Sequence, residues 1–487
     1  MKHFTIFFCL VLASVVLVYG LPKKPVSNPP GKDHSGPKWG TYIGYGDEGG
    51  SGAETIACDP AGNVYVGGSS TLHKNIATPN GLHPKFIGGN WDAYLAKFTS
   101  EGKVQWATYF GGDGGDDILG ISAGTDGIYI TGETDSKTGI SVNDPNKSMF
   151  SGKMASFLAK FNFEGKLIWS TYISGDRSIQ AQAITVGTDN QIYITGHTSS
   201  SKGVATNGAW QTTYHGREDA FVMKYSPDGK CTWATYYGGN GTDLAVSIAV
   251  NHKGEAYITG STSSDSGISS NGAFQANLGG KNDAFLAKFS TTGQLAWATY
   301  FGGDSMEEAK SVALGPDDEV YITGGTASRS KIATRGAWQT KYGGGYFDIY
   351  LAKFHEDGKL DWATYYGRAG KDQGFSVAVD TANDVCLTGR TSSQEGFATP
   401  GCYKEVHPTH TELDAFLIKF NSNGRLLYSS FFGGDKHDEG WAMTFDRNNN
   451  LYFAGYTESE TGITTKNAYQ AKKTPKWGSG FLVRFVF

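Results

Sequence analysis

The chain has 487 residues and a formal net charge of −5; 68 residues are glycine, 39% are hydrophobic and 13% are aromatic. The aromatic content excludes a disordered chain, and the glycine content excludes a helical bundle and favours short strands joined by tight turns. The acidic balance argues against a nucleic-acid partner, because phosphate binding requires a basic surface.

The N-terminal segment has the pattern of a secretory signal peptide. Lys2 and His3 precede an apolar run from Phe4 to Tyr19, which ends at Gly20. This run is shorter than the roughly 20 residues that a membrane-spanning helix requires. We therefore expect residues 1–20 to be cleaved and 21–38, rich in proline and lysine, to form a flexible spacer. The protein is expected to be secreted, with no membrane span and as a monomer.

A phrase of the type "WATYFGG" recurs through the rest of the chain. Its copies begin at Trp39, Trp106, Trp169, Trp233, Trp297, Trp362 and Tyr428, at spacings of 63 to 67 residues. Seven units therefore fill residues 39–487. Repetition at such a period predicts one closed architecture rather than several ordinary domains.

Each unit contains four runs with strand composition. In one unit these are "KSVALGP", "EVYITGG", "DIYLAKF" and "LDWATYYGR", with hairpin turns at "DD" and "HEDGK". The pattern predicts an all-β fold, a seven-bladed β-propeller with four-stranded antiparallel blades. The repeated tryptophans are expected to pack between blades.

The frame of the repeat also predicts how the ring closes. The last unit ends at its third strand, "GFLVRFVF", whereas the first "WGTYIG" precedes any complete blade. Trp39 to Gly44 should therefore supply the outer strand of the seventh blade, beside residues 480–487. No sheet edge is then left open at the seam.

Several linked phrases carry a family resemblance. They are "GG-x-x-x-D-x-x-x-S-I-A-V", "YITG-x-T", "GA[FW]Q-x-x-Y-G-G" and "DAF[LV]AKF". Across residues 39–487 the chain resembles the SBBP family of seven-bladed propeller repeats. The resemblance implies a propeller in an extracellular or cell-surface setting and brings no catalytic motif.

Acidic residues recur where each chain segment enters an innermost strand. The set is Asp116, Asp243, Glu307, Asp372 and Asp438, and Ser51 and Ile179 interrupt it. The carboxylates could gather at one channel mouth and bind Ca²⁺ as a cofactor. The alternative is that each accepts hydrogen bonds from its own loop.

Two further repeated positions have structural interpretations. The basic residue of "AKF" is expected at a water-facing strand end. The aromatic residue of "GA[FW]Q" is expected to pack its long loop onto its own blade. "VHPTHTELD" offers His407, His410 and Glu412 as metal ligands, but a polar loop is favoured because no further ligand stands at a familiar spacing.

A ligand site is expected where the copies differ, because repeated residues serve the scaffold. Trp91, Trp441 and Trp477 stand outside the repeated frames, in neighbouring blades one and seven. They could form an aromatic patch for a carbohydrate or a protein partner, or they could plug the seam. Cys386 and Cys402 could pair, although free thiols are favoured. Asn146 and Asn240 lie in sequons that matter in a eukaryotic host.

The sequence favours a secreted, non-catalytic binding or scaffold protein. No nucleophile motif or unique pair of carboxylates indicates hydrolysis. The alternative is an extracellular enzyme, a hydrolase or lyase, with its site at the channel mouth.

Overall fold

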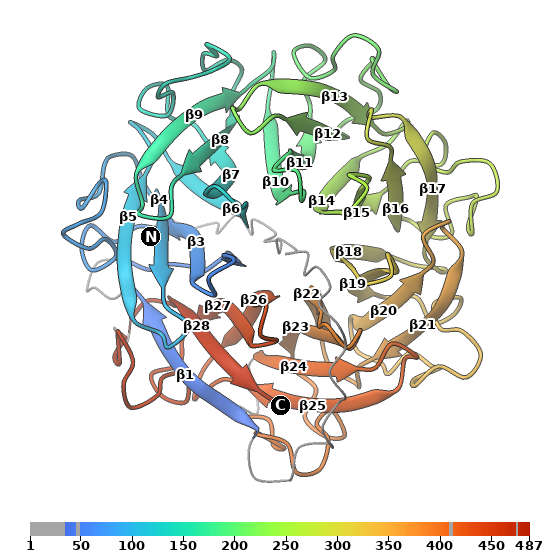
Figure 1. The fold of residues 1–487 in the computed structure, drawn as a ribbon. Helices are drawn as coiled ribbons and strands as arrows, with labels where there is room; N and C mark the ends of the chain where they lie inside the picture. The colour runs from blue at the N-terminus through green and yellow to red at the C-terminus, as the bar shows by residue number, and fades with distance from the viewer. Residues whose placement is uncertain (1–34, 45–48, 409–412, 474–475) are drawn as a thin grey trace, which may run out of the picture.

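The computed structural model describes residues 35–44, 49–408, 413–473 and 476–487. The expected signal peptide (1–20), residues 21–34 of the expected spacer, His410 and Glu412 lie outside these ranges. The described residues form 28 strands in seven antiparallel sheets of four, arranged as a ring (Figure 1). The seven-bladed propeller is confirmed, and the described part of the chain contains no helix that could span a membrane.

In blades one to six the strands follow one another in chain order from the axis of the ring outward. Blades one to three consist of β2 (Thr55–Cys58), β3 (Val64–Ser70), β4 (Asp92–Phe98) and β5 (Val104–Phe110); β6 (Asp116–Ala123), β7 (Ile128–Thr134), β8 (Ala155–Phe161) and β9 (Leu167–Ile173); β10 (Ile179–Val186), β11 (Ile192–Thr198), β12 (Asp219–Tyr225) and β13 (Cys231–Tyr237). Blades four to six consist of β14 (Asp243–Val250), β15 (Ala256–Thr262), β16 (Asp283–Phe289) and β17 (Leu295–Phe301); β18 (Glu307–Leu314), β19 (Val320–Thr326), β20 (Asp348–Phe354) and β21 (Leu360–Tyr366); β22 (Asp372–Val379), β23 (Val385–Thr391), β24 (Asp414–Phe420) and β25 (Leu426–Phe432).

Blade seven is built from both ends of the described chain. Its order from the axis outward is β26 (Asp438–Phe445), β27 (Leu451–Thr457), β28 (Ser479–Val486) and β1 (Gly36–Ile43). β1 pairs with β28 in antiparallel register, from Gly36 opposite Val486 to Ile43 opposite Gly480. The predicted closure by the N-terminal strand is confirmed, and this strand begins at Gly36, before Trp39.

The ring has two faces of different construction. The turn face carries the tight hairpins between the first and second and between the third and fourth strands of each blade. The loop face carries the long loops between second and third strands and the connections from one blade to the next. This assignment follows from the antiparallel order, because alternate strand ends lie on the same face.

A tryptophan clasp joins six of the seven outer strands to the next blade, and β25 of blade six has Tyr428 at this position instead. Trp233 of β13 donates its Nε1–H to the carbonyl of Thr291, 3.0 Å away in the β16–β17 turn. A Cβ atom at Gly293 of that turn would lie 2.7 Å from Trp233 Cδ2, so the indole packs on bare backbone. The turn glycines Gly102, Gly165, Gly229, Gly358 and Gly424 meet Trp39, Trp106, Trp169, Trp297 and Trp362 in the same way. The expected packing of these tryptophans between blades is confirmed.

Each long loop protects the outer edge of its own sheet. Ser270 donates its N–H to the carbonyl of Ala298 in β17 and accepts the Ala298 N–H on its Oγ at 2.9 Å. Equivalent pairs are Thr78 with Ala107, Thr206 with Ala234, Thr334 with Ala363, Thr399 with Ser429 and Thr465 with Gly40. The outer strands therefore offer few free backbone groups to another chain.

The clasp can be tested with two glycines of blade four. Gly272 (φ +80) and Gly293 (φ +79) both have left-handed backbone, but an added Cβ at Gly272 meets nothing within 4 Å. We expect Gly272→Ala to lower the free energy of unfolding by roughly 1–2 kcal/mol, the strain of left-handed alanine. Gly293→Ala should lose a further ~1–3 kcal/mol because Trp233 is overpacked. Denaturant unfolding measures both; equal losses would contradict the clasp.

Candidate functional site

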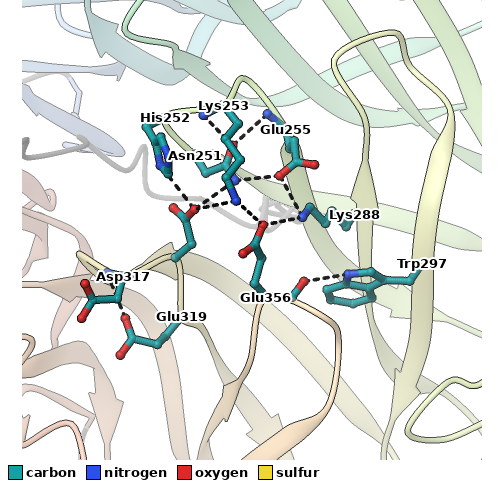
Figure 2. A network of polar contacts seen from close by, with 10 residues as sticks. Asn251, His252, Lys253, Glu255, Lys288, Trp297, Asp317, Glu319 and Glu356 are labelled. Carbon is teal, nitrogen blue, oxygen red and sulfur yellow. Dashed lines mark hydrogen bonds and ion pairs between the residues drawn. The ribbon is translucent and has the colours of Figure 1, made fainter.

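The repeated lysine belongs to the scaffold, and its predicted water-facing position is wrong. Lys288 of β16 is only 6% exposed, and its ammonium lies 5.3 Å from the ring centroid of Tyr257. Figure 2 shows it between Glu255, at 2.8 Å, and Glu356, at 3.1 Å. The lysine is buried because a tyrosine on the neighbouring strand and acidic turn residues replace its water.

A depression on the turn face adjoins this network. It has a volume of about 540 Å³ and is lined by Lys288, Trp297, Asp317, Glu319, His355, Glu356 and Asp357. Glu356 also pairs with Lys253 at 2.7 Å, and its carbonyl accepts the Trp297 Nε1–H at 2.9 Å (Figure 2). The hydrogen bonds and ion pairs here serve the junction of blades four and five, so we do not assign this depression as the site.

The acidic series lies buried at separate blade junctions. Asp116 accepts hydrogen bonds from the Gly112 N–H at 2.8 Å, Thr134 Oγ1 at 2.5 Å and Ser136 Oγ at 2.8 Å. Asp243, Glu307, Asp372 and Asp438 also have buried side chains with loop N–H and hydroxyl donors. This arrangement matches the alternative interpretation, in which each acid accepts hydrogen bonds from its own loop. Within the described ranges no three His, Cys, Asp or Glu side chains are placed to hold a metal ion, and Ca²⁺ binding stays a prediction.

Each acid of the series faces a second acid from the preceding blade. At Gly238 an added Cβ would lie 2.8 Å from both Asp219 Cγ and Asp243 Oδ2. The pairs are Asp92 with Asp116, Asp219 with Asp243, Asp283 with Glu307, Asp348 with Asp372, and Asp414 with Asp438. Where the series is interrupted, both partners change: Ala155 stands with Ile179, and Ser479 with Ser51. The pair, and not the single acid, is therefore the repeated unit.

Burial keeps these carboxyl groups partly protonated. Desolvation raises the pKa of Asp219, Asp348 and Asp438 to about 7. The neighbouring acid acts in the same direction, because like charges disfavour ionisation. We expect Asp219 and Asp348 each to share one proton with the acid that faces it.

A different cluster of carboxyl groups lies at the inner rim, the axis side of the innermost strands. Glu54 precedes β2, Asp117 lies on β6 and Glu133 lies on β7. Desolvation raises the pKa of Glu54 to about 8 and that of Glu133 to about 7, and the pKa of Asp117 lies well above its ordinary value. Repulsion from Glu133 adds to the rise in the pKa of Glu54, and repulsion from Glu54 and Glu133 adds to that of Asp117, whereas the hydrogen bond from Asp117 lowers the pKa of Glu54.

The adjoining part of the inner rim holds a neutralised cluster in blades six and seven. Glu439 of β26 pairs with Arg390 at 2.6 Å and with His437 at 3.1 Å, and Trp441 donates its Nε1–H to it at 2.7 Å. Burial alone would raise the pKa of Glu439, but the His437 hydrogen bond and the Arg390 charge lower it to about 2. Trp441 stacks on Tyr456 with ring centroids 5.6 Å apart.

The structure places the three unrepeated tryptophans in two settings. Trp441 lies on the inner rim, whereas Trp91 and Trp477 are each 40% exposed on the loop face. The ring of Trp91 covers Gly115 at the junction of blades one and two. Trp477 lies in blade seven with the Lys476 ammonium 5.4 Å from its ring centroid. Among the described residues, no ring contact joins these three tryptophans to one another.

The other sequence candidates have specific environments. His407 is buried and pairs through Nδ1 with Asp414 at 2.9 Å, so it does not lie in a solvated polar loop. Within the described ranges Cys58, Cys231, Cys386 and Cys402 are free thiols. Asn146 and Asn240 are exposed, and their glycosylation stays a prediction. The loop aromatics also contact the next blade, as Trp210 does with Phe289, so the expectation of packing on one blade was incomplete.

The carboxyl cluster could have been found by comparing the seven copies. In six innermost strands a β-bulge leaves one residue outside the ladder, at Leu119, Gln182, Val246, Lys310, Phe375 and Trp441. Glu54 holds the same frame position in blade one and is the only acid among them. The rule that function lies where copies differ therefore indicates Glu54, which an inspection limited to tryptophans overlooked.

The comparisons with known proteins show distant relatives. No protein-family model matches the sequence. The chain is 23% identical over 328 residues, 56% of its length, to an uncharacterised WD repeat-containing protein, L264, of Acanthamoeba polyphaga mimivirus. It is 23% identical over 314 residues, 60% of its length, to the regulatory protein FlaEY of Caulobacter vibrioides. The matched regions span 23% and 31% of these relatives, which are longer proteins.

Solved structures also show similarity. Sqt1 from Chaetomium thermophilum has a TM-score of 0.42 and 12% identity, with 93% of this chain and 99% of that chain covered. The WD-repeat name of the viral relative fits a propeller. Membership of the SBBP family stays a prediction.

The acid pairs predict a dependence of stability on pH. The folded chain raises the pKa of Asp219, Asp348 and Asp438 above the unfolded value of roughly 4, so stabilisation by the protonated form is complete below pH ~4 and is lost as pH rises through ~7. We expect the melting temperature to fall between pH 5 and pH 8. Asp348→Asn should reduce this fall, whereas exposed Asp304→Asn should not. Equal melting temperatures at both pH values in the parent protein would contradict the shared-proton pairs.

Proposed function

We propose that this protein is a secreted, monomeric, non-catalytic binding propeller that holds an extracellular protein or carbohydrate with its loop face. The observation that carries the proposal is the contrast between two classes of tryptophan. The outer-strand tryptophans of the repeat are used by the clasps, whereas Trp91 and Trp477, which stand outside the repeated frame, leave 40% of their surface exposed. Exposed aromatic anchors of this kind supply contact area and a polar N–H to a partner.

The position of these tryptophans supports the same conclusion. Trp91 and Trp477 come from blades one and seven, the neighbours across the closure, and both belong to loop-face segments. The backbone beneath them is fixed: the Trp91 carbonyl accepts the Asp116 N–H at 3.1 Å, and the Trp477 carbonyl accepts a hydrogen bond from Lys473 Nζ at 2.8 Å. A rigid backbone that presents an exposed ring loses little entropy on binding.

The proposal is tested by paired tryptophan variants. Trp91→Ala/Trp477→Ala should abolish binding to a glycan array or a synthetic-peptide array while leaving the melting temperature nearly unchanged. The matched control is Trp210→Ala/Trp338→Ala, because these tryptophans are similarly exposed but belong to the repeated frame. The control should keep binding. Loss of binding in both pairs, or no ligand for the parent protein on either array, would contradict the seam site.

A second candidate is an extracellular hydrolase or lyase, and one observation favours it. Three carboxyl groups with raised pKa gather at the inner rim. A carboxyl group that keeps its proton near neutral pH is what a general acid requires. This candidate predicts turnover of a polysaccharide or ester that Glu54→Gln abolishes, measured by product release; binding without turnover favours the first proposal.

A further inference from the structure

The inner rim of blades one and two carries three carboxyl groups that no cationic side chain of the described chain pairs with. Elsewhere on the rim, acids have cations: Glu308 pairs with Lys310 at 2.8 Å, and Glu439 with Arg390 at 2.6 Å. In the described part of the chain, Glu54, Asp117 and Glu133 have no ion-pair partner. The cluster of Glu54, Asp117 and Glu133 does not recur in the repeat, so it has no evident role in closing the ring.

Two oxygen atoms of this cluster are buried without a donor from any amide, hydroxyl or cationic group. Ser69 Oγ donates to Glu54 Oε1 at 3.0 Å, and Glu54 and Asp117 hydrogen-bond to each other through a carboxyl proton, but no other group of the described chain donates to Glu54 Oε2 or Asp117 Oδ1. Glu54 is only 6% exposed, so water does not replace the missing donor freely. An acceptor in such a position is costly unless a donor reaches it. Glu133 differs, because Gln182 donates to its Oε1 at 3.0 Å.

An aromatic ring adjoins the same acceptors. A Cβ atom at Gly52 would lie 2.8 Å from Trp441 Cζ3 and 3.4 Å from Glu54 Oε1, so the indole and the carboxyl group meet at this glycine. Trp441 is held in place by its stacking on Tyr456 and by its bond to Glu439. Trp441 and Asp117 are partly exposed, so the cluster is open to a ligand from solvent.

These groups fit an organic cation better than a metal ion. No three acidic, histidine or cysteine side chains of the described chain are placed around a common metal position. A guanidinium group instead needs acceptors for its fork of N–H donors and a flat ring for its face. Carboxyl oxygens and an indole side by side supply both.

We propose that the inner rim binds the guanidinium group of an arginine on a protein partner, with Glu54 and Asp117 accepting its N–H donors and Trp441 against its face. The inference deepens the proposed function and rests on it, because it names the chemistry of the partner. Arginine entering the rim from the loop face would satisfy Glu54 Oε2 and Asp117 Oδ1.

Binding of a cation here is linked to the release of protons. Burial raises the pKa of Glu54 to about 8, so this group holds a proton at neutral pH until a cation stabilises its charged form. The affinity should therefore increase from pH 6 to pH 9. The other titratable groups around the cluster and its neighbour are Tyr94, Asp117, Glu133, His197, Arg390, His437, Glu439 and Tyr456. Loss of the His437 proton would act in the same direction, because it removes a nearby positive charge.

The experiment uses two peptides and isothermal titration calorimetry on the full chain. The probes are acetyl-Gly-Arg-Gly-amide and acetyl-Gly-citrulline-Gly-amide, which differ by the charge of the side chain. We expect the arginine peptide to bind at least about tenfold more tightly, with proton release visible as buffer-dependent heat. Equal affinity for both peptides, or no binding of the arginine peptide, would overturn the inference.

Isosteric variants locate the bound peptide. Glu54→Gln and Asp117→Asn should each weaken arginine-peptide binding at least about tenfold and should fold normally, because a neutral amide of the same shape replaces a carboxyl group that is protonated in the free protein. Glu308→Gln is the matched control: it occupies the frame position of Asp117 in blade five and should bind like the parent protein. Unchanged binding by Glu54→Gln would place the peptide elsewhere and end the inference.

The outcome is separable from that of the seam test. Array binding that depends on Trp91 and Trp477 but shows no preference for arginine would leave the proposed function in place and refute the rim site. An arginine peptide held at Glu54, with no array ligand at the seam, would refute the seam site and support the rim alone.

Discussion

The ring depends on the contact between an outer-strand tryptophan and a glycine turn in the next blade. The indole is a large apolar group with one donor, and the turn offers it a carbonyl and a surface without Cβ atoms, as Thr291 and Gly293 do for Trp233. The glycine has two roles: its missing Cβ leaves room for the indole, and its positive φ forms the hairpin turn. Blade geometry and blade-to-blade attachment are therefore set by one residue pair.

Different repeated residues stabilise the two faces of the ring. On the turn face, Lys288 and its equivalents are enclosed between tyrosine rings and turn acids. On the loop face, carboxyl pairs such as Asp348 and Asp372 share a junction around a glycine. With these positions fixed, the freedom to vary is concentrated at the bulged rim residues and at the ends of the long loops. Both candidate binding regions lie there.

The sequence predicted the fold because its signals are local. The period of the "WATYFGG" phrase, the turn residues and the missing fourth strand of the last unit each lie within one unit, and together they gave seven blades and closure by β1. The exposure of Lys288 was predicted wrongly because its partner Glu356 is 68 residues away in the next blade. In the sequence, a lysine at the surface and a lysine buried beside a distant carboxylate have the same local pattern.

The same distinction explains what was found and missed at the candidate site. Trp91, Trp441 and Trp477 were recognisable as residues outside the frame, but their separation onto the loop face and the inner rim depends on a bulge in β26. The sequence did not show that Asp219 is the partner of Asp243, because the two residues meet only where their blades lie side by side. Glu54 could be recognised only by aligning all seven innermost strands, because it stands out as the one acid where the other six blades have non-acidic residues.

Closure by β1 has a consequence for how the molecule is made. Of the described strands, the one that completes blade seven is synthesised first, and its partner β28 is synthesised last. Six blades can therefore stack during synthesis while the apolar flanks of blades one and six stay uncovered. The final step is a pairing across more than four hundred residues, for which loop-closure entropy is greatest. The interval before that pairing is when the nascent chain is most exposed to misassociation, and it ends only when β28 is available to pair with β1.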